Sequence, residues 1–167
     1  TFALSHGILT GMGDGTMSPD AYLTRGMFVT MLYRAAFEPV APNAPFSDVP
    51  YLSYYNKAAD WAYENGISNG RGDGTFGGEE NITRQDIAVM LYRFADCMGV
   101  TVSGKAGING YYDSAEVSSY AETAVKWAVY NGIISGRDGN LLAPKATATR
   151  AEAAAMCQRF IELALAK

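Results

Sequence analysis

The chain has 167 residues, a formal net charge of −4, and 49% hydrophobic and 18% charged residues, which is typical of a folded globular protein. This charge supplies no basic surface for nucleic acid or for an anionic membrane, and no uninterrupted apolar run approaches the roughly 20 residues that cross a bilayer. We therefore expect neither nucleic acid nor a membrane as a partner, and an anionic ligand would need a local cationic pocket.

A glycine-rich segment that ends in Thr-Arg occurs three times. Residues 7–27 read GILTGMGDGTMSPDAYLTRGM, residues 66–86 read GISNGRGDGTFGGEENITRQD, and residues 132–152 read GIISGRDGNLLAPKATATRAE. The Gly-Ile pairs and the Thr-Arg pairs keep the same two intervals, 59 and 66 residues. Most of the additional residues of the longer interval fall in the Gly/Ser stretch 99–110, which predicts a surface connector. The chain is therefore a tandem repeat.

Each repeat predicts two helices joined by a glycine-rich turn. In the second copy, residues 51–65 carry alanines and aromatics at near-helical spacing, and Asn65-Gly66-Ile67 is a helix stop signal. The Asp-Gly pair that follows predicts a tight turn. The second helix begins after the threonine of Thr-Arg, where residues 149–152 match a capping box that residues 83–86 approximate. The opening TFALSHGI predicts a helix end, so we expect the natural protein to begin upstream.

One such two-helix unit is too small to bury its own apolar face, whereas three units can bury theirs against one another. We therefore predict a mainly α fold in which three tandem helix–turn–helix units form a pseudo-threefold bundle, although the repeat also allows a linear stack. Cys97 and Cys157 both fall in predicted helices. We expect Cys157 to be a buried thiol, and two cysteines do not make a disulfide scaffold.

The arginines of the Thr-Arg pairs are predicted in the first turn of a helix, where the helix dipole disfavours a cation by about 0.3–1 kcal/mol. Because Arg25, Arg84 and Arg150 share this position, we interpret them as an anion-binding feature. A guanidinium group and the free amides of a helix N-terminus both suit a carboxylate or a phosphate. The alternative is internal pairing with acidic side chains, for which Asp48 and Asp113 are candidates.

Two tryptophans, Trp61 and Trp127, occupy matching positions before the Gly-Ile pairs, and the first copy has Phe2 there. An indole face beside a cationic pocket suits stacking against a sugar ring. The alternative is that these aromatic side chains belong to the core.

Catalytic chemistry is not indicated. The chain has one histidine, no Ser/His/Asp set and no evident cluster of metal ligands, so we predict no enzyme, no catalytic residue, no metal and no cofactor. Gly-Asp-Gly-Thr is similar to part of a calcium loop, but no copy has the alternate oxygen ligands and final glutamate of an EF-hand. A calcium-dependent protein–protein or lattice-assembly module is the alternative function.

With these motifs laid out, the chain resembles the S-layer homology (SLH) family. The second copy, with FSDVP, ADWAYENGI, GRGDGTF and ITRQD, follows the family pattern throughout, and the third, with YYDSAEV, VKWAVYNGI and ATRAE, is nearly as close. The resemblance implies a three-pronged, pseudo-threefold helical domain. It divides the chain into unit 1 at 1–45, which lacks its opening helix, unit 2 at 46–98, the connector at 99–110 and unit 3 at 111–167.

Members of this family tether surface proteins non-covalently to secondary cell-wall polymer on peptidoglycan, often through pyruvylated N-acetylmannosamine. The resemblance therefore implies an extracellular module, monomeric within a larger exported protein, which binds a cell-wall polysaccharide with an acidic ketal group. The ligand-binding residues that it implies are the Thr-Arg arginines, the matching tryptophans, the first glycine of each turn and the early aspartates: Arg25, Arg84, Arg150, Trp61, Trp127, Gly11, Gly70, Gly136, Asp48 and Asp113. The aspartates are expected to position the groove rather than to touch the acid.

The chain departs from the family pattern in two respects. The first copy lacks the early aspartate and carries Phe2 in place of tryptophan. The glutamate of Thr-Arg-Ala-Glu is Asp86 in the second copy and Met27 in the first. We expect this second change to weaken the helix cap rather than the anion contact.

Overall fold

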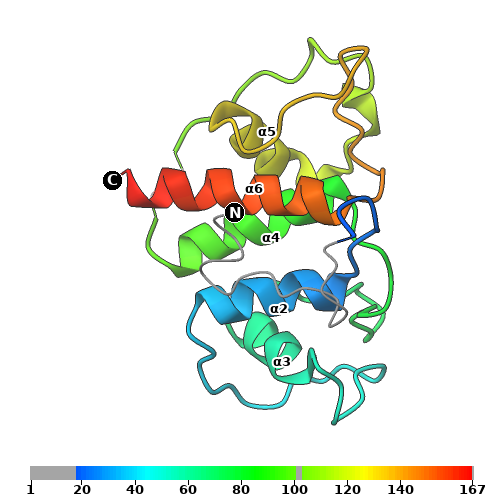
Figure 1. Cartoon of the computed structure of the whole chain (residues 1–167), viewed down its shortest axis with the longest axis vertical. Helices are drawn as coiled ribbons and strands as arrows, with labels where there is room; N and C mark the ends of the chain where they lie inside the picture. The colour runs from blue at the N-terminus through cyan, green and yellow to red at the C-terminus, as the bar shows by residue number, and fades with distance from the viewer. Residues whose placement is uncertain (1–17, 101–102, 167) are drawn as a thin grey trace.

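The computed structural model describes residues 18–100 and 103–166. Its helices, in chain order, are α2 (Arg25–Ala35), α3 (Asn56–Glu64), α4 (Arg84–Cys97), the short 3-10 helices η1 (Ser114–Glu116) and η2 (Ser119–Ala121), α5 (Glu122–Tyr130) and α6 (Arg150–Leu165) (Figure 1). Within these ranges extended backbone pairs only at isolated bridges, which confirms the mainly α prediction. No helix there has the length and apolarity that crossing a membrane requires.

The starts of α2, α4 and α6 follow the predicted capping signals. The hydroxyl groups of Thr24, Thr83 and Thr149 each accept a hydrogen bond at 3.2 Å from the amide three residues later. At Thr149 the capping box is complete, because the Glu152 carboxylate accepts the Thr149 amide at 3.0 Å. These contacts satisfy amides that have no partner within the helix.

The ends of α3 and α5 are also alike. The side-chain amides of Asn65 and Asn131 donate to the carbonyl groups of Trp61 and Trp127, at 2.9 Å in both cases. The glycine that follows each asparagine has a φ of +65° or +68°, a conformation that glycine adopts without strain. The isoleucine after it is fully buried, as expected for a helix stop that packs back on its last turn.

A closed ring of backbone hydrogen bonds joins the three repeats at the centre of the fold. The amide of Leu23 donates to the carbonyl of Ala148 at 3.1 Å, the amide of Ala148 donates to Ile82 at 3.0 Å, and the amide of Ile82 donates back to Leu23 at 2.8 Å. Each of these fully buried residues lies two positions before a Thr-Arg arginine. A linear stack would keep the first and third repeats apart, so the ring confirms the pseudo-threefold arrangement.

Helices pack between neighbouring repeats. α3 packs on α2, α5 packs on α4, and α6 contacts α4. The first two pairs therefore join the second helix of one repeat to the first helix of the next, an exchange that the repeat pattern did not predict. α2, α4 and α6 begin on the same side of the molecule, the right side in Figure 1, which gathers their first residues around the ring.

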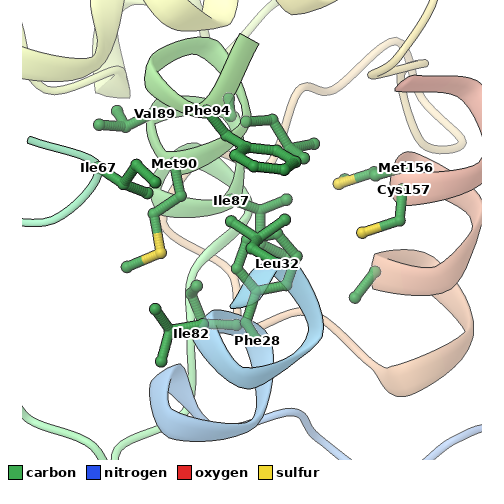
Figure 2. Packing of buried hydrophobic residues seen from close by; sticks show 14 of the residues in the cluster. Phe28, Leu32, Ile67, Ile82, Ile87, Val89, Met90, Phe94, Met156 and Cys157 are labelled. Atoms are coloured by element: carbon green, nitrogen blue, oxygen red, sulfur yellow. The ribbon is translucent and has the colours of Figure 1, made fainter. Parts of the chain in front are cut away.

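The hydrophobic core lies where α2, α4 and α6 meet. Phe28 and Leu32 of α2, Phe94 of α4 and Cys157 of α6 are all buried and point into this region (Figure 2). Full burial of a phenylalanine or leucine side chain stabilises the fold by about 1.5–3 kcal/mol. Burial raises the pKa of the Cys157 thiol to about 12, so it is a protonated core side chain, as predicted. Cys97 is exposed, and neither cysteine forms a disulfide.

Because the ring amides link all three repeats, we predict that Leu23, Ile82 and Ala148 exchange with deuterium only through global unfolding. Their protection, followed in ¹⁵N–¹H spectra, should be equal and should match the free energy of unfolding from a denaturant titration. The amide of Leu165, near the exposed end of α6, is the control and should exchange much faster. Markedly weaker protection of one ring amide would contradict a closed ring.

Candidate functional site

The three predicted arginines occupy the first position of the helices around the ring: Arg25 in α2, Arg84 in α4 and Arg150 in α6. All three are buried, at 9% exposed or less. Their backbone amides, and the next amide in each helix, donate to carbonyl groups of a neighbouring repeat at 2.8–3.0 Å, and the third amide donates to the N-cap threonine. The expectation that these amides are open to a ligand is therefore wrong, because contacts between repeats use them.

The side chain of Arg25 crosses from the first repeat into the second. Its Nε donates to the carbonyl of Phe76 at 3.0 Å, and its Nη1 donates to Asp86 at 3.3 Å. The guanidinium group also lies 5.5 Å from the centroid of the Phe76 ring, within range of a cation–π contact. Burial lowers the pKa of Arg25, and Asp86 opposes that shift. The group stays charged because the pKa of arginine starts far above neutrality.

Arg84 repeats this geometry between the second and third repeats. Its Nε donates to the carbonyl of Leu142 at 3.0 Å, its Nη1 to Glu152 at 3.2 Å, and its Nη2 to the carbonyl of Ser135 at 3.0 Å. Burial lowers the pKa of Arg84 as well, and Glu152 opposes the shift. All three nitrogen atoms of this side chain therefore have partners within the protein.

Internal pairing of the arginines, one of the two alternatives from the sequence, is thus present. The partners of Arg25 and Arg84 are Asp86 and Glu152, each at the third helical position of the next repeat, and not the early aspartates. Arg150 also interacts within the protein. An external anion must therefore use the guanidinium surface that these contacts leave.

A cleft of about 520 Å³ opens beside Arg25 at the junction of the first and second repeats. We call it the first cleft, and its charged residues are Arg25, Arg71, Arg93, Glu80 and Asp86. Three guanidinium groups and two carboxylates line the same space, so the site is locally cationic although the chain carries a net charge of −4.

A second, smaller cleft of about 150 Å³ lies beside Arg84 at the junction of the second and third repeats. The charged residues of this second cleft are Arg84, Arg137, Arg159 and Glu152. They occupy the repeat positions of Arg25, Arg71, Arg93 and Asp86 in the first cleft. The two clefts are therefore copies of one site related by the pseudo-threefold repeat.

The basic residues of the turn and of the helix middle were missed by sequence reasoning. Arg93 and Arg159 each donate to the carbonyl of a Gly-Ile isoleucine, at 3.4 and 3.1 Å, which holds them at the cleft edge. Arg71 lies in the turn of the second repeat, and Arg137 stands at the matching position of the third. The signal available was this recurrence in register in the two complete copies.

The carboxylates of the early aspartates, Asp48 and Asp113, accept hydrogen bonds from backbone amides. The two carboxylate oxygens of Asp48 accept the amides of Phe76 and Gly77 at 2.7 and 2.8 Å, and Asp113 accepts the two equivalent amides of the third repeat at 2.8 and 2.7 Å. The Phe76 carbonyl accepts the hydrogen bond from Arg25 Nε. By binding the amides of Phe76 and Gly77, Asp48 therefore fixes the chain segment that Arg25 contacts. Both aspartates thus act on the shape of the clefts.

Trp61 and Trp127 lie in the core, at 3% and 1% exposed, where they contact Phe94 and Phe160. Neither indole presents a face against which a sugar ring could stack. The core alternative therefore describes their placement, and the carbohydrate-stacking expectation is not met.

The turn glycines Gly70 and Gly136 line the first and second clefts respectively, while Gly11 lies outside the described residues. Gly70 has a φ of +73°, and a Cβ atom there would lie 2.3 Å from the carbonyl oxygen of Thr75. Only glycine fits this position without strain. In the same turn, Asp73 accepts hydrogen bonds from the amide and hydroxyl of Thr75 at 3.0 and 2.6 Å, which confirms the predicted tight turn.

Comparison with known proteins identifies the family. The S-layer homology domain model matches residues 1–26, 45–88 and 110–154, which together cover most of the chain and coincide with the three repeats. The chain belongs to the S-layer homology family. Among the described residues, no group of three His, Cys, Asp or Glu side chains could hold a metal ion.

Relatives of this SLH chain include enzymes and surface proteins. It is 32% identical to "Exoglucanase XynX" of Acetivibrio thermocellus over 95% of the chain and 14% of the relative. It is 26% identical to the "Surface-layer 125 kDa protein" of Lysinibacillus sphaericus over 93% of the chain and 13% of the relative. It is 25% identical to the "Cellulosome-anchoring protein" of Acetivibrio thermocellus over 92% of the chain and 35% of the relative. The chain thus spans only a small part of each relative.

Glu152 should make the stability of the module sensitive to acid. Burial raises the pKa of its carboxyl group, but hydrogen bonds from the Thr149 amide and the Arg137 guanidinium outweigh burial and lower the pKa below the ordinary 4.5. The folded state therefore binds this proton less tightly than the unfolded state, and the stability that Glu152 contributes above pH 4.5 is lost as the pH falls through the folded pKa. We expect Glu152→Gln to flatten the fall of Tm between about pH 5 and pH 3. An unchanged slope, equal to that of the exposed control Glu162→Gln, would contradict this role.

Asp48 should contribute to stability through its two amide contacts. Replacing the carboxylate in Asp48→Asn removes one acceptor and the charge, and we expect the free energy of unfolding to fall by about 1–3 kcal/mol. Urea denaturation measures this change, with Asp96→Asn on the exposed face of α4 as the matched control. A loss no larger than that of the control would show that the amides of the turn do not depend on Asp48.

Proposed function

We propose that this chain is a cell-wall anchoring module, which binds an acidic polysaccharide non-covalently and thereby tethers a larger exported protein to the wall. The observation that carries the proposal is the first cleft, where Arg25, Arg71 and Arg93 line a space of about 520 Å³, a size usual for small-ligand sites. SLH family membership and relatives named as surface-layer and cellulosome-anchoring proteins support the same function.

The chemistry of the first cleft favours a carboxylate. A guanidinium group binds a carboxylate through charge-assisted hydrogen bonds in a fixed planar geometry. Arg25 uses its Nε and Nη1 on the protein, and no described residue accepts a hydrogen bond from its Nη2. We propose that this nitrogen, together with Arg71 and Arg93, holds the carboxylate of a pyruvate ketal on N-acetylmannosamine of the secondary cell-wall polymer.

Neutral polar groups around the same cleft suit the rest of the saccharide. Ser68, Asn69 and Asn81 line it, and hydroxyl and amide groups both donate to and accept from sugar hydroxyls. Tyr120, which comes from the third repeat, donates to Asp86 at 2.8 Å. Burial, and next its hydrogen bond to Asp86, raise the pKa of Tyr120 to about 12, so this phenol is a neutral donor at the cleft edge.

The module's place in the parent protein follows from the same proposal. Anchoring at the cell wall puts the chain outside the cell as one monomeric part of a larger protein, whose own activity is independent of the clefts. Occupation of more than one cleft along a polymer would raise the avidity above the affinity of a single site. The role of Arg150 at the third junction stays a prediction.

Co-sedimentation with peptidoglycan that carries the polymer tests the proposal. Enzymatic or mild-acid removal of pyruvate should weaken binding at least tenfold, about 1.4 kcal/mol, and the double variant Arg71→Gln/Arg93→Gln should weaken binding to untreated wall. Lys57→Gln/Lys126→Gln removes the same charge outside both clefts and should bind normally. Undiminished binding to wall without pyruvate, or an equal loss in both double variants, would reject the acidic-ketal ligand.

A further inference from the structure

The two clefts differ in how their internal carboxylates are used. In the second cleft one oxygen of Glu152 accepts from Arg84 Nη1 at 3.2 Å and from Arg137 Nε and Nη2 at 3.0 and 2.7 Å. This single carboxylate therefore bridges two of the three arginines. In doing so it occupies the place between them that a ligand carboxylate would take.

No described carboxylate bridges the corresponding pair in the first cleft. Asp86 accepts from Arg25 at 3.3 Å through one oxygen and from the Tyr120 hydroxyl at 2.8 Å through the other. Arg71 pairs instead with Glu80. The side chains of that pair are 43% and 57% exposed, and such an exposed pair is easily displaced. The space between Arg25 and Arg71 is thus open.

The difference has a simple covalent cause. Asp86 and Glu152 hold the same position in their helices, directly after the Thr-Arg pair and one further residue, but glutamate is one methylene longer. Glu152 reaches the turn arginine of its cleft while its other oxygen caps the Thr149 amide at 3.0 Å. The shorter Asp86 contacts Arg25 and Tyr120 and does not reach Arg71. The cleft volumes, about 520 and 150 Å³, follow the same order.

Net charge alone would favour the second cleft, which has three arginines and one carboxylate against three and two in the first. The hydrogen bonds within the second cleft favour ligand binding in the first cleft instead. Every nitrogen of Arg84 is engaged within the protein. A ligand would have to displace Glu152 from three charge-assisted hydrogen bonds to two arginines, whereas Glu80 in the first cleft pairs with Arg71.

We propose, on the basis of the proposed function, that the first cleft is the receptor for the acidic saccharide and that Glu152 acts as an internal plug in the second. The length of the side chain at the third helical position then sets which junction of the module binds. Glu152 is a specificity-determining residue of the second cleft, and Asp86 is its counterpart in the first.

Reciprocal substitution tests this inference in the 167-residue chain. The probe is the methyl glycoside of 4,6-O-pyruvylated N-acetylmannosamine, titrated into ¹⁵N-labelled protein, with the amides of Gly70 and Gly136 reporting on the first and second clefts. In the wild type we expect Gly70 to saturate at a concentration about tenfold lower than Gly136. Glu152→Asp should tighten binding at Gly136 about tenfold, and Asp86→Glu should weaken binding at Gly70 by a similar factor.

Glu162→Asp on the exposed side of α6 is the matched control and should change neither site. Equal affinities at the two amides in the wild type, or an unchanged ratio in Glu152→Asp, would overturn the plug while leaving the anchoring function in place. A wild-type protein in which neither amide responds to the probe would overturn the proposed function itself. Both variants keep the charge and shorten or lengthen one side chain, so a matching thermal unfolding curve verifies that each is folded.

Discussion

Three backbone hydrogen bonds, which join Leu23, Ala148 and Ile82 in a closed ring, determine how the repeats meet. Because each of these residues lies two positions before a Thr-Arg arginine, the ring places three helix starts around one axis. The side chains of Arg25 and Arg84 then reach into the next repeat. The clefts are a consequence of this closure, since they form at junctions between repeats and not within one.

The ring also explains how a cation is tolerated at a helix N-terminus. The dipole penalty of about 0.3–1 kcal/mol is offset by a carbonyl and a carboxylate of the neighbouring repeat, Phe76 and Asp86 for Arg25. The first two backbone amides of the same helix donate to carbonyl groups of a neighbouring repeat. A ligand can therefore contact only the outer edge of each arginine cluster. The length of the acidic side chain at the third helical position, Asp86 or Glu152, determines how much of that edge is open.

Local features were predictable from the sequence because their causes are local. The repeats, the threonine caps and the asparagine–glycine helix ends all follow from residues close together in the chain. The closed bundle was predicted from the number of repeats, which also allowed a linear stack, and the ring between residues far apart in the chain decides between the two. The pairing of α3 with α2 and of α5 with α4 could not be predicted from the sequence. An apolar face shows that a helix is buried but not which helix covers it. The same reason explains Trp61: its position suited both core and surface, and only the packing places it in the core. Arg71 and Arg93 line one cleft with Arg25 because the side chain of Arg25 crosses from the first repeat into the second, and the sequence register alone could not locate that crossing.

A crystal structure of the module with a pyruvylated N-acetylmannosamine glycoside tests the central claim most directly. The account predicts the ketal carboxylate within hydrogen-bond distance of the Arg25 guanidinium in the first cleft, with the Leu23–Ala148–Ile82 ring intact. A saccharide bound elsewhere on the surface, with the first cleft holding only water, would contradict it.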